Sequence, residues 1–216
     1  MTSTASQYLK LVAFMLFVSI VTQIAYVGLL ADVGIVEGWP LRSTIWAIET
    51  VAFAVLAVAA LATLAEYDRY RLIWAAVAIS GVLNALQAGM GLSMFLPPSQ
   101  AGDSGKLLFD TVLAGAFVFF FLAKALIGLA SVMLGFAVFK MGSRIGTIIG
   151  VLAMLAGVAA IALNIAALPQ GLTLVFAAGA AGTAATLTLA IATWLVSGAK
   201  QQRIGDGQAI DSDGVG

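Results

Sequence analysis

Six long apolar stretches constrain the fold of this chain more than any other feature. They lie near residues 10–31, 43–66, 71–95, 109–139, 144–168 and 172–197. Each could cross about 30 Å of hydrocarbon as a helix that rises about 1.5 Å per residue. Short polar, Gly-rich or Pro-containing segments separate them, among them Trp39-Pro40 and Pro97-Pro98, and such residues favour helix ends. The sequence therefore predicts an all-α polytopic membrane protein with a bundle of six transmembrane helices.

Composition supports this class. The chain is 62% hydrophobic and only 9% charged, whereas soluble domains carry about 25% charged residues. We expect one transmembrane domain at residues 1–199 and a polar, disordered cytoplasmic tail at residues 200–216. The first apolar stretch is too long for a typical signal peptide, so we expect it to be retained as a helix.

The distribution of basic residues predicts the orientation in the membrane. If the N-terminus is cytoplasmic, the inner loops and ends hold Lys10, Arg69, Arg71, Lys140, Arg144, Lys200 and Arg203. The outer loops then hold only Arg42 and Lys106. Because cytoplasmic loops are enriched in Lys and Arg, both termini are expected in the cytoplasm of a multi-pass plasma (inner) membrane protein. Trp39 and Trp46 would then lie at the outer interface, with Trp74 and Trp194 at the inner one.

Two missing residue types exclude many kinds of chemistry. The chain contains no histidine and no cysteine, and its formal net charge is zero. Imidazole and thiolate metal sites, thiol nucleophiles and Ser-His-Asp triads are therefore excluded. We expect no catalytic residues, metal ion or cofactor, and no nucleic-acid partner. An intramembrane enzyme is the least favoured function.

Two opposite charges lie inside the apolar stretches at a similar depth. Glu49 precedes Glu66 by 17 residues, and Lys124 precedes Lys140 by 16 residues. Both are thus about 25 Å above the cytoplasmic helix ends, in the outer half of the bilayer. We expect Lys124 to face the bundle interior and to pair with Glu49. A structural ion pair, a ligand or proton site, and two unrelated groups that snorkel remain alternatives.

Other polar residues gather at similar depths and form the candidate ligand site. The candidate ligand-binding residues are Gln23, Tyr26, Glu49, Asn84, Gln87, Lys124 and Asn164. They predict a polar pocket that opens to the outside above an apolar floor. Interhelical hydrogen bonds that only specify packing are the alternative for the uncharged members.

Small residues predict close helix packing in that floor. Gly142, Gly146, Gly150 and Gly157 recur at short helical spacings, with Ala153 continuing the series. Such residues let helix backbones approach closely. We expect them to contact other helices of this chain rather than a second copy.

One hairpin resembles a known family. The stretch GLASVMLGFAVFKMGSRIGTIIGVLAMLAGVAAIAL resembles the fourth-to-fifth helix hairpin of a large, uncharacterised bacterial family of six-helix membrane proteins, which is known as a domain of unknown function. The resemblance covers about residues 8 to 199. The family often has polar or histidine residues early in helix 4, where this chain has Leu122, Ala123 and Lys124. The resemblance implies the fold and no specific activity.

Two functional hypotheses follow. The first is a small transporter or membrane ligand-binding protein whose small amphiphilic or zwitterionic ligand would suit Glu49 and Lys124. The second is a structural or accessory subunit of a membrane complex, in which the polar residues only specify helix packing. Besides the lipid bilayer, a homodimer or a larger membrane complex is compatible with either hypothesis.

Overall fold

All regular structure in the described residues is helical. The computed structural model describes residues 3–30, 32–67 and 70–211. Its elements are α1 (Ser3–Leu30), α2 (Trp39–Glu66), α3 (Arg71–Met94), α4 (Leu96–Gln100), η1 (Gly102–Gly105), α5 (Lys106–Phe139), α6 (Arg144–Gln170), η2 (Gly171–Leu174) and α7 (Val175–Asp211).

Five continuous helical segments are long and apolar enough to cross a membrane. They are Thr4–Leu30, Trp39–Glu66, Arg71–Gln100, Gly102–Phe139 and Arg144–Gly198. The predicted all-helical class is confirmed, and these segments indicate a membrane protein. The last segment is the longest because it includes α6, η2 and α7 as far as Gly198.

Within this last segment, the chain reverses direction at η2. The side-chain amide of Asn164 in α6 donates to the backbone oxygen of Ala178 in α7 over 3.1 Å. In one continuous helix, residues this far apart in sequence would be separated by about 21 Å. Gly171 supplies the turn with a φ of 61°, which is a left-handed value that suits glycine. The arms α6 and α7 therefore form a hairpin.

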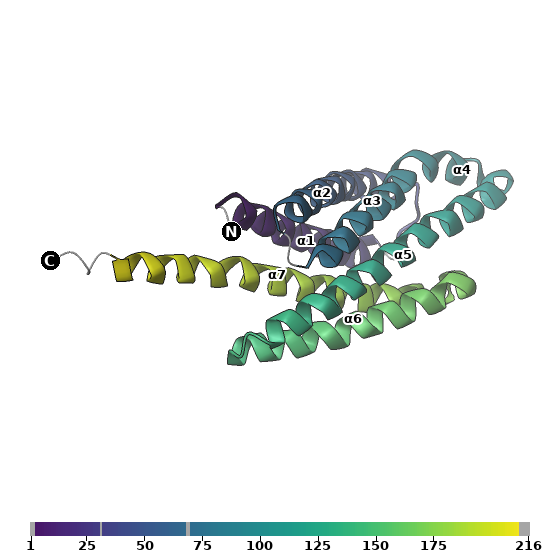
Figure 1. Ribbon diagram of the computed structural model, residues 1–216. Helices are drawn as coiled ribbons and strands as arrows, with labels where there is room; N and C mark the ends of the chain where they lie inside the picture. The colour runs from purple at the N-terminus through teal and green to yellow at the C-terminus, as the bar shows by residue number, and fades with distance from the viewer. Residues whose placement is uncertain (1–2, 31, 68–69, 212–216) are drawn as a thin grey trace.

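The helices pack side by side as an elongated bundle. The start of α1 and the end of α7 lie toward one end, and α4 lies at the other (Figure 1). Extensive contacts join α2 to α3, α3 to α5, and α5 to both α6 and α7, while α1 packs between α2 and α7. The structure continues α7 as a helix to Asp211, beyond the predicted domain end at residue 199. Residues 212–216 of the predicted tail lie outside the described residues.

Three of the four prolines lie in the first turns of helices. Pro40 lies in the first turn of α2, and the pair Pro97-Pro98 begins α4. Proline is tolerated in a first turn because the backbone N–H that it lacks would have no intrahelical acceptor there. The helix predicted to start near residue 43 therefore starts at Trp39.

Glycines bring α5 and α6 into backbone contact. A Cβ atom on Gly150 would lie 2.6 Å from the backbone oxygen of Gly135, and one on Gly157 would lie 2.5 Å from that of Gly128. The predicted close packing is confirmed for Gly150 and Gly157, and it occurs within the chain.

Two tryptophans differ from the predicted interface positions. Trp74 is fully buried in the main core cluster, and Trp46 is 4% exposed in a separate aromatic cluster. Both side chains therefore face the protein interior rather than lipid. Trp194 is 52% exposed, which is compatible with an interfacial position.

Candidate ligand site inside the helix bundle

The structure buries both charges that the sequence places inside the apolar stretches. Glu49 on α2 is 5% exposed and Lys124 on α5 is 1% exposed. Each helix turns its charge inward because a lone charge facing hydrocarbon costs several kcal/mol. The predicted interior position of Lys124 is confirmed.

The Glu49 carboxylate is held by α1. Its Oε1 atom accepts a hydrogen bond from the Thr22 hydroxyl over 2.9 Å. The same hydroxyl lies 3.0 Å from the backbone oxygen of Ser19. Because a hydroxyl has one proton, Thr22 can serve only one of these acceptors fully at a time.

The Lys124 ammonium is held by Gln23, which follows Thr22 on α1. Its Nζ atom donates to Oε1 of Gln23 over 2.9 Å, and the Thr183 hydroxyl of α7 donates to the same oxygen over 3.1 Å. The ammonium also lies 5.4 Å from the centre of the Phe120 ring. The Lys124 stem packs against Gly182, where a Cβ atom would come within 2.7 Å of it. A glycine at position 182 therefore makes room for the lysine.

The two charges do not form a direct ion pair. No nitrogen–oxygen distance between Lys124 and Glu49 falls within 4.0 Å, although both residues lie in the described part of the chain. The predicted direct pairing is therefore wrong in this structure. The physical reason is the position of α1, whose adjacent residues Thr22 and Gln23 each bind one of the charges.

The other candidate residues make separate contacts. Asn84 is 1% exposed and donates to Ser80 of its own helix, while its Oδ1 atom is buried without a partner. Asn164 is fully buried and joins α6 to α7, and its Oδ1 atom is also unpartnered. Gln87 is half-buried on α3. Within the described residues, a hydrogen bond thus joins Gln23 and Lys124 of the predicted set, and Glu49 is linked to them through Thr22, the neighbour of Gln23 on α1.

Tyr26 belongs to a different cluster at the predicted outer end. Its hydroxyl accepts a hydrogen bond from Arg42, and its ring stacks on Trp46 with a centroid distance of 5.6 Å. Trp46 also meets Phe95 edge-to-face at 5.4 Å. Because Trp46 precedes Glu49 by about one turn of α2, these rings lie between Glu49 and that end of the bundle.

Sequence reasoning missed three residues of this region. Thr22 and Thr183 bind the charged groups directly or through Gln23, but apolar helices contain many threonines that bind only their own backbone. Arg42 was expected in an outer loop, yet it is 4% exposed and donates to the backbone oxygens of Leu30 and Val33. Leu30 ends α1, and a cation near the last carbonyls of a helix is a recognisable signal.

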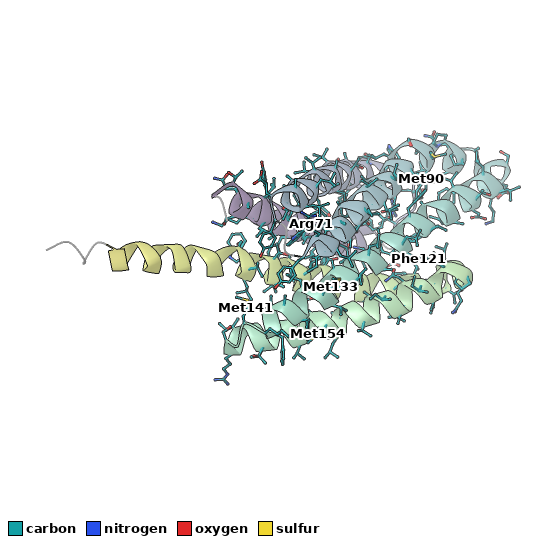
Figure 2. The ribbon with its side chains drawn as sticks, in the orientation of Figure 1. Arg71, Met90, Phe121, Met133, Met141 and Met154 are labelled. Carbon is teal, nitrogen blue, oxygen red and sulfur yellow. The ribbon has the colours of Figure 1, made fainter. Side chains whose placement is uncertain are left out.

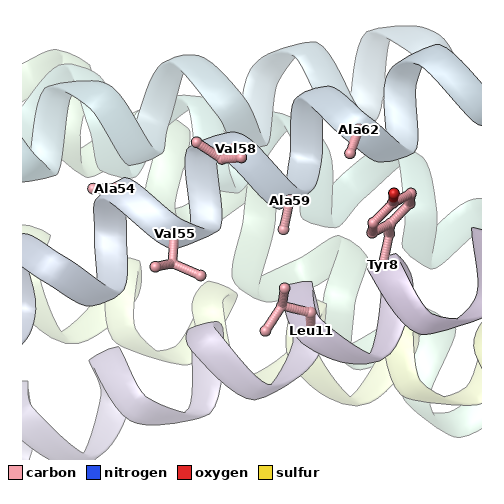
Figure 3. A pocket seen from close by; sticks show the side chains of 7 residues that line it. All are labelled: Tyr8, Leu11, Ala54, Val55, Val58, Ala59 and Ala62. Carbon is pink, nitrogen blue, oxygen red and sulfur yellow. The ribbon is translucent and has the colours of Figure 1, made fainter.

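Neither of two hollows on the described part of the protein is lined by a candidate residue. An apolar groove of about 300 Å³ lies between α1 and α2, lined by Leu11 and Val55 among others (Figure 3). A second groove of about 610 Å³ lies where the α5–α6 turn meets α7. In this conformation the polar residues near Glu49 and Lys124 lie under the aromatic cluster rather than in either hollow.

No match to this chain was found among protein-family models, curated proteins or solved structures. The resemblance to the uncharacterised six-helix family therefore stays a prediction.

Proposed function

We propose that this protein is a small transporter or ligand-binding protein of the inner membrane, with a site for a small zwitterionic or amphiphilic ligand between Glu49 and Lys124. The observation that carries the proposal is the arrangement of these two charges. They are buried in the same bundle, yet each is bound by a different residue of α1 instead of by the other.

Unused hydrogen-bonding capacity supports a ligand at this position. An ammonium group has three donors, and Lys124 uses one for Gln23. A carboxylate has about four acceptor positions, and Glu49 uses one for Thr22. Buried charges with so few partners are costly, and additional charge-assisted hydrogen bonds lower that cost. A ligand with one anionic and one cationic group offers a matching bond to each residue.

We further propose six membrane crossings with both termini in the cytoplasm. The reversal between α6 and α7 supports counting them as two crossings. The excess of Lys and Arg in the loops and ends on the side of both termini supports the orientation. In this orientation, Glu49 and Lys124 occupy the outer half of the bilayer. The aromatic cluster around Trp46 would have to move for a ligand to enter from outside.

Variants of the two charges test the proposal. Lys124→Met alone is expected to lower the folded yield, because it leaves Glu49 without a nearby positive charge. Glu49→Gln combined with Lys124→Met is expected to recover that yield. Lys106→Met is the matched control, because Lys106 is a solvent-exposed lysine whose loss leaves the interior unchanged.

Ligand binding is then measured by thermal unfolding in detergent with glycine betaine, alanine and dodecyl betaine as probes. At least one probe should raise the Tm of the wild type and of Lys106→Met, but not that of the double variant. Equal shifts in the double variant would refute binding between the two charges. A double variant no more stable than Lys124→Met would show that the charges are not coupled.

An accessory subunit is the second candidate function. The segment Arg144–Gly198 is the least buried of the membrane-crossing candidates. In its most apolar stretch of 18 residues, 28% of the residues are buried, against 50% in that of Trp39–Glu66. Its outward face could meet a partner helix as well as lipid. Full activity of the double variant in cells, together with no probe binding by the wild type, would favour this function.

A further inference from the structure

The second groove lies far along the chain from the candidate ligand site and has a different chemistry. It is formed where α5 turns into α6 and where α7 passes this turn. Figure 2 shows Met141 at this end of the bundle, beside α7. Its volume of about 610 Å³ is twice that of the groove between α1 and α2.

The walls of the groove are largely apolar. Val138 contributes a fully buried side chain at its base, while Ile145 is 65% exposed and Trp194 is 52% exposed. Large apolar side chains with this exposure suit contact with acyl chains. An exposed tryptophan at the end of an apolar helix is typical of the level of lipid headgroups.

The mouth of the groove is basic. Arg144 lines it with an exposed side chain. Lys140 does not line the groove but lies four residues earlier, directly after α5; it is also exposed, and its ammonium lies 4.3 Å from the centre of the Phe136 ring. None of the residues that line the groove is acidic. The sequence has no Asp or Glu between Asp110 and Asp206, so neither α6 nor the membrane-crossing part of α7 carries an acidic side chain.

This charge pattern selects an anion. A guanidinium group binds phosphate through two parallel hydrogen bonds, and no described acidic residue competes for Arg144. At the start of α6 the Gly146 N–H already donates to the Ser143 hydroxyl over 3.0 Å, so the Arg144 side chain is the main group available to the anion. Loop charges of this kind also set topology, but topology alone does not require a groove with an apolar wall beside them.

We propose that this groove binds an anionic phospholipid, with its phosphate at Arg144 and an acyl chain against Ile145 and Trp194. Basic pockets between helices at the cytoplasmic side are known sites for anionic lipid headgroups. The assignment of the groove to the cytoplasmic leaflet follows the proposed orientation. The lipid site itself does not depend on the proposed role of Glu49 and Lys124.

Native mass spectrometry of the full-length protein in detergent tests the lipid site. Dioleoyl phosphatidylglycerol and dioleoyl phosphatidylcholine, which share their acyl chains, are titrated in parallel. The wild type should bind the phosphatidylglycerol more tightly. Arg144→Gln should weaken that binding by about tenfold or more, as expected for the loss of one guanidinium–phosphate contact. Lys106→Gln, which removes an exposed positive charge at the opposite end, should leave it unchanged.

Two further experiments separate the contribution of the acyl chains from that of the anionic headgroup. Trp194→Ala should weaken both lipids by a similar factor, because it removes apolar contact without changing charge. Glycerol phosphate, which has the anion without acyl chains, should not displace phosphatidylglycerol at equal concentration. Displacement by glycerol phosphate would show that the groove binds a free anion rather than a lipid, and would overturn the proposal.

Equal affinity for the two lipids, or equal effects of Arg144→Gln and Lys106→Gln, would overturn the proposal. Because Arg144 is exposed, its variant should unfold at the wild-type temperature. Lys140→Gln provides a second test if it does not.

Discussion

The backbone contact between α5 and α6 makes a sharp prediction for Gly157→Ala. An added Cβ atom would lie 2.5 Å from the backbone oxygen of Gly128 and 2.9 Å from the backbone nitrogen of Val132. The first distance is about 0.9 Å shorter than the 3.4 Å at which ordinary contact begins. Backbone atoms of a helix cannot rotate away, so the two helices must move apart.

The expected cost follows from this separation. A gap of about 0.5–1 Å removes a quarter to a half of the attraction between facing atoms. Overpacking of this kind costs about 1–3 kcal/mol. Alanine is favoured over glycine within a helix by about 1 kcal/mol, which offsets part of that cost. We expect Gly157→Ala to lower the free energy of unfolding by up to about 2 kcal/mol.

Gly89→Ala is the matched control. Gly89 lies inside α3, and an added Cβ atom would meet no atom within 4 Å. This variant should be neutral or more stable than the wild type by up to about 1 kcal/mol. Both are measured by reversible unfolding in mixed micelles of dodecyl maltoside and sodium dodecyl sulfate. If Gly157→Ala is as stable as Gly89→Ala, the close approach of α5 and α6 is refuted.

Three other outcomes follow from the contacts described above. Gln23→Leu should destabilise the protein by about 1.5–3 kcal/mol in the same assay, because it removes the acceptor of a buried ammonium, and a neutral result would show that Lys124 does not depend on it. Arg42→Met should lower the thermal unfolding temperature more than Tyr26→Phe, because it strips the donor from two backbone oxygens as well as from the tyrosine; equal effects would argue against that role. Because the chain has no cysteine, a single cysteine can be introduced at position 106 or 144. Lys106→Cys should react with an impermeant maleimide in intact cells, whereas Arg144→Cys should react only after lysis. The opposite pattern would invert the proposed orientation.

The helical class and the interior position of the two charges could be predicted because both depend only on position along the helix axis. Hydropathy and length identify helices that cross a membrane, and residue counts give the depth of Glu49 and Lys124 along them. The cost of a charge in hydrocarbon then requires an inward direction. The small-residue contacts of Gly150 and Gly157 follow from the same reasoning about close approach.

The partners of the charges could not be predicted because depth does not specify which helices are neighbours. Glu49 and Lys124 share a level, yet α1 supplies their hydrogen-bond partners. Trp74 likewise is predicted at an interface from its position along the chain, but its direction around α3 takes it into the core. The sequence predicts Arg42 in a loop because no sequence pattern shows that the first turn of α2 packs against the end of α1.

The position of Thr22 and Gln23 on α1 has a consequence for biosynthesis. Among the described helices, α1 leaves the ribosome before the others, so the donor for Glu49 (Thr22) and the acceptor for Lys124 (Gln23) are made before the residues that they bind. Glu49 meets Thr22 as soon as the next helix inserts, whereas Lys124 arrives three long helices after Gln23, and Thr183 arrives last. The order of translation therefore lets the buried side chains of Glu49 and Lys124 enter the bilayer after their hydrogen-bond partners on α1.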